Sequence, residues 1–220
     1  MRSIIVALCL ASVTASAATI LGFGAEVDYY TPTASGDFNY KTTQTHFGSD
    51  QESGYQVGIY FEHPAPLIPN LRVDLTPEIS YSGIDGAAVS KVSLDQVDIT
   101  PYYEIMDNVI DLDIGMTFKV LEGKIEGTDN QSFKEVIPMG YLGIAITPPL
   151  SPLSLEGSVK YIEYSGDSLT DARIKACWKI AQGFGAQAGY RYESLKISDH
   201  FNINADTTFK GPFVGLNYRF

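Results

Sequence analysis

Histidines near carboxylates are the first groups to consider for chemistry, because such pairs supply general bases in hydrolases. The chain has 3 histidines, and two of them, His46 and His200, lie in polar segments, with Asp199 directly before His200. Adjacency in the sequence does not place a carboxylate against an imidazole. His63 lies in a proline-containing segment, and Cys177 alternates with apolar neighbours. We therefore expect no catalytic residue. A hydrolase that uses Asp and His side chains of these polar segments is a minor alternative.

Paired acids are the next candidates, because hard cations such as Ca²⁺ prefer oxygen ligands. Two pairs, Glu26/Asp28 and Asp111/Asp113, are spaced to share one face of a strand. No segment has the regular ligand spacing of a calcium loop, and no phosphate loop or nucleotide fingerprint is present. We expect neither a metal nor a cofactor.

The charge balance narrows the range of partners. The 220 residues include 15 Lys+Arg and 26 Asp+Glu, for a net charge of −11, which argues against nucleic acid as a partner. Hydrophobic residues make up 45% and charged residues 19%, so the chain is not expected to be disordered. The mean hydropathy of −0.01 fits a soluble protein, but it also fits alternating strands with one lipid-facing side.

The first 17 residues read as a targeting segment. A basic start is followed by a short apolar run, Ile4 to Val13, and by Ala15-Ser16-Ala17. This order is typical of a secretory signal peptide, which we expect to be cleaved after Ala17. Residues 18–220 then form the mature barrel domain.

A period of two dominates the mature chain, which predicts β-strands. Ten segments carry it: 20–30, 53–62, 71–82, 94–105, 111–121, 135–147, 153–163, 171–180, 184–195 and 209–220. Strands of soluble proteins are usually about 5–6 residues long, whereas a tilted strand crosses a bilayer in about 9–11. We predict an all-β fold, a transmembrane antiparallel up-and-down β-barrel of ten strands. Eight strands is the alternative if 20–30 or 135–147 is misassigned.

Connections of alternating length support the barrel. Short turns are expected at 63–70, 106–109, 148–152 and 181–183, and mostly longer polar linkers at 31–52, 83–93, 122–134, 164–170 and 196–208. Outer-membrane barrels combine short periplasmic turns with longer external loops. Aromatic residues at the strand ends predict two interfacial girdles. The expected members are Tyr29, Tyr55, Tyr81, Tyr161 and Tyr192 near the long linkers, and Phe61, Tyr103, Trp178, Phe184 and Phe220 near the short turns.

The polar faces predict a lumen with two walls of opposite charge. The expected acidic wall comprises Glu26, Asp28, Asp74, Glu78, Asp98, Glu104, Asp111 and Asp113. The expected basic wall comprises Lys160, Arg173, Lys175, Lys179 and Arg191. Two interpretations stay open: an ion-pair network that fills the lumen, or a transverse field across a narrow polar channel.

The last strand resembles the C-terminal assembly signal of Gram-negative outer-membrane barrels. Val214, Leu216, Tyr218 and Phe220 place apolar or aromatic residues at every second position and end the chain on Phe. The resemblance implies export to the bacterial outer membrane, with membrane lipid and the barrel-assembly machinery as partners. The predicted role is structural or interactive, with a narrow passive channel for small polar solutes; no extracellular ligand can be named. A soluble periplasmic lipocalin-like binding barrel, with an apolar lumen, is the main alternative.

Overall fold

The computed structural model describes residues 21–220 except 41–42, 66, 86–87, 127–129 and 201–202, so the expected signal peptide lies outside the described residues. All regular elements of the described residues are strands. They are β1 (Gly22–Tyr30), β2 (Thr33–Tyr40), β3 (Thr43–Gln51), β4 (Gly54–Glu62), β5 (Asn70–Asp85), β6 (Ala88–Met106), β7 (Ile110–Glu126), β8 (Gln131–Ile146), β9 (Leu153–Tyr164), β10 (Asp167–Ala181), β11 (Phe184–His200) and β12 (Ile203–Arg219). No helix in this part of the chain is long and apolar enough to cross a membrane.

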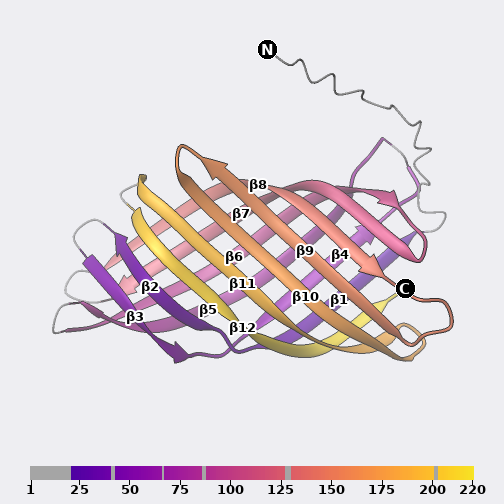
Figure 1. Cartoon of the computed structure of the whole chain (residues 1–220), viewed down its shortest axis with the longest axis horizontal. Helices are drawn as coiled ribbons and strands as arrows, with labels where there is room; N and C mark the ends of the chain where they lie inside the picture. Colours follow the sequence, from indigo (N-terminus) through magenta and orange to yellow (C-terminus); the bar gives the residue numbers. More distant parts are fainter. Residues whose placement is uncertain (1–20, 41–42, 66, 86–87, 127–129, 201–202) are drawn as a thin grey trace, which may run out of the picture.

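The strands close into an antiparallel barrel. Each strand from β4 to β12 pairs with the next, and β1 pairs with both β4 and β12, which completes the ring. β2 continues β1 along β12, and β3 leads into β4, so the wall has ten strands as predicted. Figure 1 shows the tilted strands, with β2 and β3 at one end and the C-terminus at the other. We call these the hairpin end and the turn end.

The connections match the prediction only at the turn end. The four short turns follow β4, β6, β8 and β10 where expected. The predicted long linkers are wrong: the strands continue through most of each linker, and β2 and β3 occupy most of 31–52. Alternating apolar residues such as Phe38 and Tyr40 carried this extension in the sequence, and they face inward as strand residues do.

The outer surface carries an apolar band around the turn half of the barrel. Its residues include Ile59, Ile114, Leu142, Ile174 and Leu216, each exposed. Beyond the band, toward the hairpin end, many outward positions are polar, although Ile84 and Val89 are also exposed there. Examples are Glu122 on β7, Lys134 on β8 and Lys210 on β12.

Most predicted girdle residues face outward as expected, and Tyr81 is the exception. Tyr29, Tyr55, Tyr161 and Tyr192 are exposed, whereas Tyr81 is buried. The register of β5 against β6 shifts between Thr76 and Ile79, and such a bulge turns every later side chain to the other face.

An apolar cluster fills the lumen of the hairpin half. It draws on β2, β3 and the extended parts of the other strands, and its rings pack in contact, such as Phe38 on Phe133 and Tyr81 on Phe209. The cluster comprises Tyr30, Ala34, Phe38, Tyr40, Phe47, Ile79, Tyr81, Val92, Leu94, Leu121, Ile125, Phe133, Met139, Leu169, Leu195, Ala205, Phe209 and Phe213. In this half the apolar side chains therefore lie inside the barrel, as they do in the core of a water-soluble β-barrel.

Candidate functional site in the lumen

A charged network spans the lumen of the turn half. Its members are linked by ion pairs into one continuous set, and carboxylates and cations are equal in number. They are Glu26, Asp28, Asp74, Asp98, Glu156, Asp171 and Glu193, with Arg72, Lys119, Lys160, Arg173, Lys175, Arg191 and Arg219. Balanced pairing is what makes buried charge tolerable, because an unpaired buried ion is costly.

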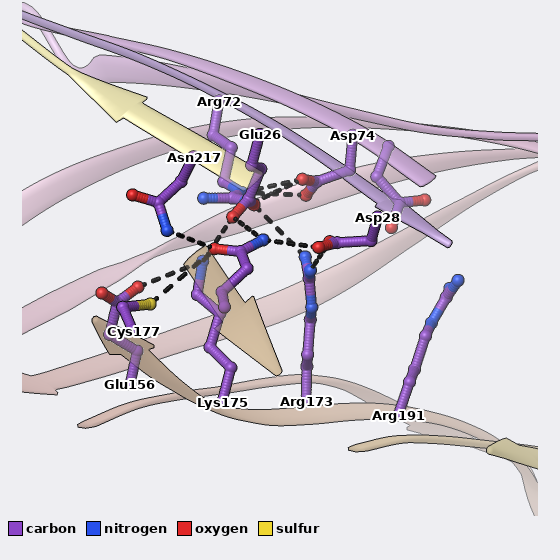
Figure 2. Close-up of polar contacts among 12 residues, drawn as sticks. Glu26, Asp28, Arg72, Asp74, Glu156, Arg173, Lys175, Cys177, Arg191 and Asn217 are labelled. Atoms are coloured by element: carbon purple, nitrogen blue, oxygen red, sulfur yellow. Dashed lines mark hydrogen bonds and ion pairs between the residues drawn. The ribbon is translucent and has the colours of Figure 1, made fainter. Parts of the chain in front are cut away.

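Glu26 on β1 forms one centre of this network. It receives Arg72 from β5 and both Arg173 and Lys175 from β10, so it joins three strands across the lumen. Figure 2 shows Arg173 and Lys175 reaching from β10 toward Glu26 and Asp28. Every second residue of β1 and β10 points inward, which places these side chains in the lumen, and the tilt and closure of the strands bring them to the same level.

Lys119 on β7 forms the second centre. Its side chain is fully buried, and its Nζ lies 3.2 Å from Asp98, 3.0 Å from Asp171 and 3.4 Å from Glu193. Lys160 connects the two centres, with Nζ 3.0 Å from Asp74 and 2.6 Å from Asp98.

Neutral amides complete the network, and the two predicted charged walls did not include them. Gln187 donates to Asp28 at 2.7 Å and accepts from Asn217 at 3.0 Å. Gln96 accepts from Lys119 and donates to Glu193. Their positions on the polar faces of the strands are the sequence signal that places them in the lumen.

The charged network meets the apolar cluster through cation–π contacts. The guanidinium carbon of Arg173 lies 4.2 Å from the centre of the Phe213 ring, and that of Arg191 lies 6.0 Å from the Tyr30 ring. Tyr30 and Phe213 are opposite each other in the β1–β12 ladder. The two guanidinium groups thus hold the charged network directly against the apolar cluster.

Two polar cavities lie in the lumen. A vestibule of about 330 Å³ is lined at the turn end by Glu62, Glu104, Asp107, Asp111 and Asp113, with Tyr102 bonded to Glu62. A chamber of about 40 Å³ lies deeper. Residues shared by the two linings are Arg72, Tyr141, Ser158 and Arg173.

The predicted wall residues separate into three groups. The network takes in Glu26, Asp28, Asp74, Asp98, Lys160, Arg173, Lys175 and Arg191. Glu104, Asp111 and Asp113 line the vestibule instead. The opposed walls are therefore joined across the lumen by ion pairs.

Two wall residues lie elsewhere. Glu78 lies within the bulge in β5, where it faces outward and accepts a hydrogen bond from Lys124 at 3.1 Å. Lys179 is exposed at the turn end, where the β9–β10 ladder has ended at Trp178 and the register with β11 shifts. The prediction that both face the lumen with their walls is wrong.

The chemical candidates with described side chains do not converge, and the side chains of Asp199 and His200 lie outside the described part of the structure. His46 contacts Asp37 at 2.8 Å on the exposed face of the β2–β3 hairpin, and His63 bonds to backbone atoms of its own turn. Cys177 is buried, with Gln187 as its weak hydrogen-bond acceptor at 3.7 Å. No group of three or more metal-ligating side chains occurs among the described residues.

Comparison with known proteins finds structural likeness only. No family model and no curated protein matches. Neisserial surface protein A covers 90% of this chain and 97% of its own, at 10% identity and a TM-score of 0.40. The match to the translocator domain of autotransporter NalP from Neisseria meningitidis covers 90% of this chain and 88% of that domain, with 17% identity and a TM-score of 0.46. The match to OprG, an outer membrane protein from Pseudomonas aeruginosa, covers 93% of this chain and 98% of OprG, with 11% identity and a TM-score of 0.42.

The architecture rests on this chain's own geometry. In the closed antiparallel ring every strand has a hydrogen-bonded neighbour on each side, and the apolar band lies on the outside of the ring. This is the architecture of an outer-membrane β-barrel.

Proposed function

We propose that this protein is an integral outer-membrane barrel with a structural or interactive role and a lumen that is closed at rest. The observation that carries the proposal is the continuous filling of the lumen, first by the charged network and then by the apolar cluster. Ten strands enclose little more space than eight, whose interior is filled by side chains alone. The vestibule then faces the periplasm and the hairpin end faces outside.

The last strand supports assembly at the outer membrane. Val214 and Leu216 are exposed on the lipid side, and Tyr218 packs on Phe184 with ring centres 4.7 Å apart. Phe220 exchanges backbone hydrogen bonds with Phe23 and is itself exposed. This row of side chains suits recognition by the barrel-assembly machinery.

Fractionation with heat-modifiability tests the proposal. We expect the protein in the outer-membrane fraction, with a shift in gel mobility between unboiled and boiled samples, because a closed barrel resists detergent when cold. A soluble periplasmic protein without a shift would contradict the proposal and favour the lipocalin-like alternative. Signal-peptide cleavage after Ala17 would show as Ala18 at the N-terminus of the purified chain.

A narrow passive channel is the second candidate, and the two polar cavities favour it. The apolar cluster opposes it, because water and ions avoid a dry apolar constriction. Planar-bilayer recordings separate the two candidates. We expect no discrete conductance steps, and steps that scale with salt concentration would establish the channel instead.

A further inference from the structure

The pairing of the barrel wall is interrupted between β5 and the strand formed by β3 and β4. The β4–β5 ladder ends with Val57 opposite Leu75, and pairing resumes only where His46 and Phe47 face Ile84 and Gly83. Within the described chain, no ladder joins residues 48–56 to residues 76–82. Pro77 lies in this stretch and has no N–H to donate, and the β5 bulge begins beside it.

The 40 Å³ chamber reaches this interruption. Its lining includes Val57 and Leu75, the last pair of the ladder, and the next residues along, Gln56 and Thr76. A single water needs roughly 10–15 Å³ of such space, so the chamber has room for about three. A chamber of this volume therefore suits water and excludes larger solutes.

Two residues of the chamber lining carry polar atoms that lack partners among the described residues. Gln56 is buried, with only 6% of its surface exposed, and its Oε1 has no hydrogen-bond partner among the described residues. The Nε of Arg173 is likewise buried without a partner, although its other nitrogens bind Glu26 and Asp28. An orphan acceptor and an orphan donor at one small polar cavity are the two halves of a water site.

Ile79 covers the interruption. Its side chain lies over Gly54, where an added Cβ would come within 2.6 Å of the Ile79 Cδ1. Only the absence of a side chain at Gly54 lets Ile79 lie there. Ile79 on β5 therefore contacts β4 across the stretch where the two strands are not paired.

We propose that the chamber binds a cluster of ordered water, which exchanges with the outside through the wall between β4 and β5. The site goes beyond the proposed role, because it supplies water to the buried charges from the side while the apolar cluster keeps the axis of the barrel dry. The route selects by size, so water and molecules of similar size enter and larger solutes do not.

Two oxidants of different size test the proposal on single-cysteine variants. In a Cys177→Ser background, Thr76→Cys reports on the chamber, Thr45→Cys on a buried threonine beside the apolar cluster, and Ser53→Cys on an exposed site. Each folded protein is treated with hydrogen peroxide or with tert-butyl hydroperoxide. The ratio of the two rates at one cysteine cancels the intrinsic reactivity of its thiol.

We expect the peroxide preference of Thr76→Cys to exceed that of Ser53→Cys by about tenfold or more, because access limits oxidation of a buried thiol. Thr45→Cys is expected to react with neither oxidant. Adding Ile79→Ala to Thr76→Cys should lower the preference, because the bulky oxidant then enters. Gln56→Leu should slow the peroxide reaction by replacing the orphan acceptor with an apolar group.

Three results would overturn the proposal. No reaction of Thr76→Cys with peroxide would mean a dry chamber, and a preference equal to that of Ser53→Cys would mean no size selection. A preference unchanged by Ile79→Ala would route the water through the vestibule instead. Heat-modifiability of each variant checks its fold first, and this readout separates failure of the barrel from failure of the water site.

Discussion

Along β12, Leu216 and Val214 point outward and Asn217 points inward, but nearer the hairpin end Lys210 points outward and Phe209 inward. Side chains alternate inward and outward in both halves. In the turn half the apolar side chains point outward, and in the hairpin half they point inward. In the turn half lipid takes the apolar side and the lumen must satisfy charges. In the hairpin half water takes the polar side, and the lumen packs as an ordinary core. One barrel therefore depends on two different sources of stability.

The largest effect is expected from breaking the charged network. Lys119→Met leaves Asp98, Asp171 and Glu193 buried without their shared cation, which should cost about 5 kcal/mol of unfolding free energy. Urea unfolding of the detergent-folded protein measures it. The control is Lys124→Met, at an exposed pair with Glu78, where we expect an unchanged midpoint. Equal midpoints for both variants would show that the network is not a source of stability.

A slightly smaller loss is expected from opening the apolar cluster. Phe38→Ala removes a ring stacked 5.7 Å from Phe133 and should cost about 4 kcal/mol, as large-to-small changes in cores do. Limited proteolysis should then cleave the hairpin half while the turn half keeps its heat-modifiability. Loss of both halves together would mean that they do not unfold separately.

A charge on the lipid face should cost less again. Leu216→Lys places an ammonium in the apolar band and is expected to lose about 2–3 kcal/mol in a bilayer. Thr208→Lys lies on the same strand and the same face, beyond the band, and should leave stability unchanged. If both variants lose the same stability, the band does not contact lipid.

The smallest effect is expected at an exposed ion pair of the hairpin half. Lys134→Ala removes a partner of Glu122, and both side chains are more than half or about half exposed, at 65% and 50%. Such pairs contribute about 0–1 kcal/mol, and salt screens them. At about 0.5 M salt the pair is screened, so the melting temperature of this variant should match that of the parent. A larger loss would give surface charge a part in this half.

Local pattern was enough to predict the wall of the turn half. The segment 153–163 becomes β9, Leu153–Tyr164, because alternating side chains and flanking prolines are signals within a few residues. The same alternation in 33–40 is interrupted by Ser, Gly and Asp, so the composition of this segment predicts a linker where β2 lies. Loop-like composition and strand-like period conflict there, and the period decides the structure.

The direction in which some side chains point, and which charged residues pair with each other, were harder to predict. Pro77 was the one sequence sign of the bulge that turns Glu78 outward and Tyr81 inward. The walls were predicted residue by residue, but which acid meets which base depends on strand tilt and closure. Lys119 and Asp171 are 52 residues apart and share no local pattern, so their contact at 3.0 Å required the folded ring.

The closing ladder between β1 and β12 also has a kinetic consequence. Gly24 pairs with Arg219, so the first strand waits for the end of the chain before its second edge is covered. Contacts of such long sequence separation form slowly. Until then the edge of β1 is an open template for pairing with other chains. Synthesis order thus leaves a period in which this edge needs a holding partner, and the final strand ends that period.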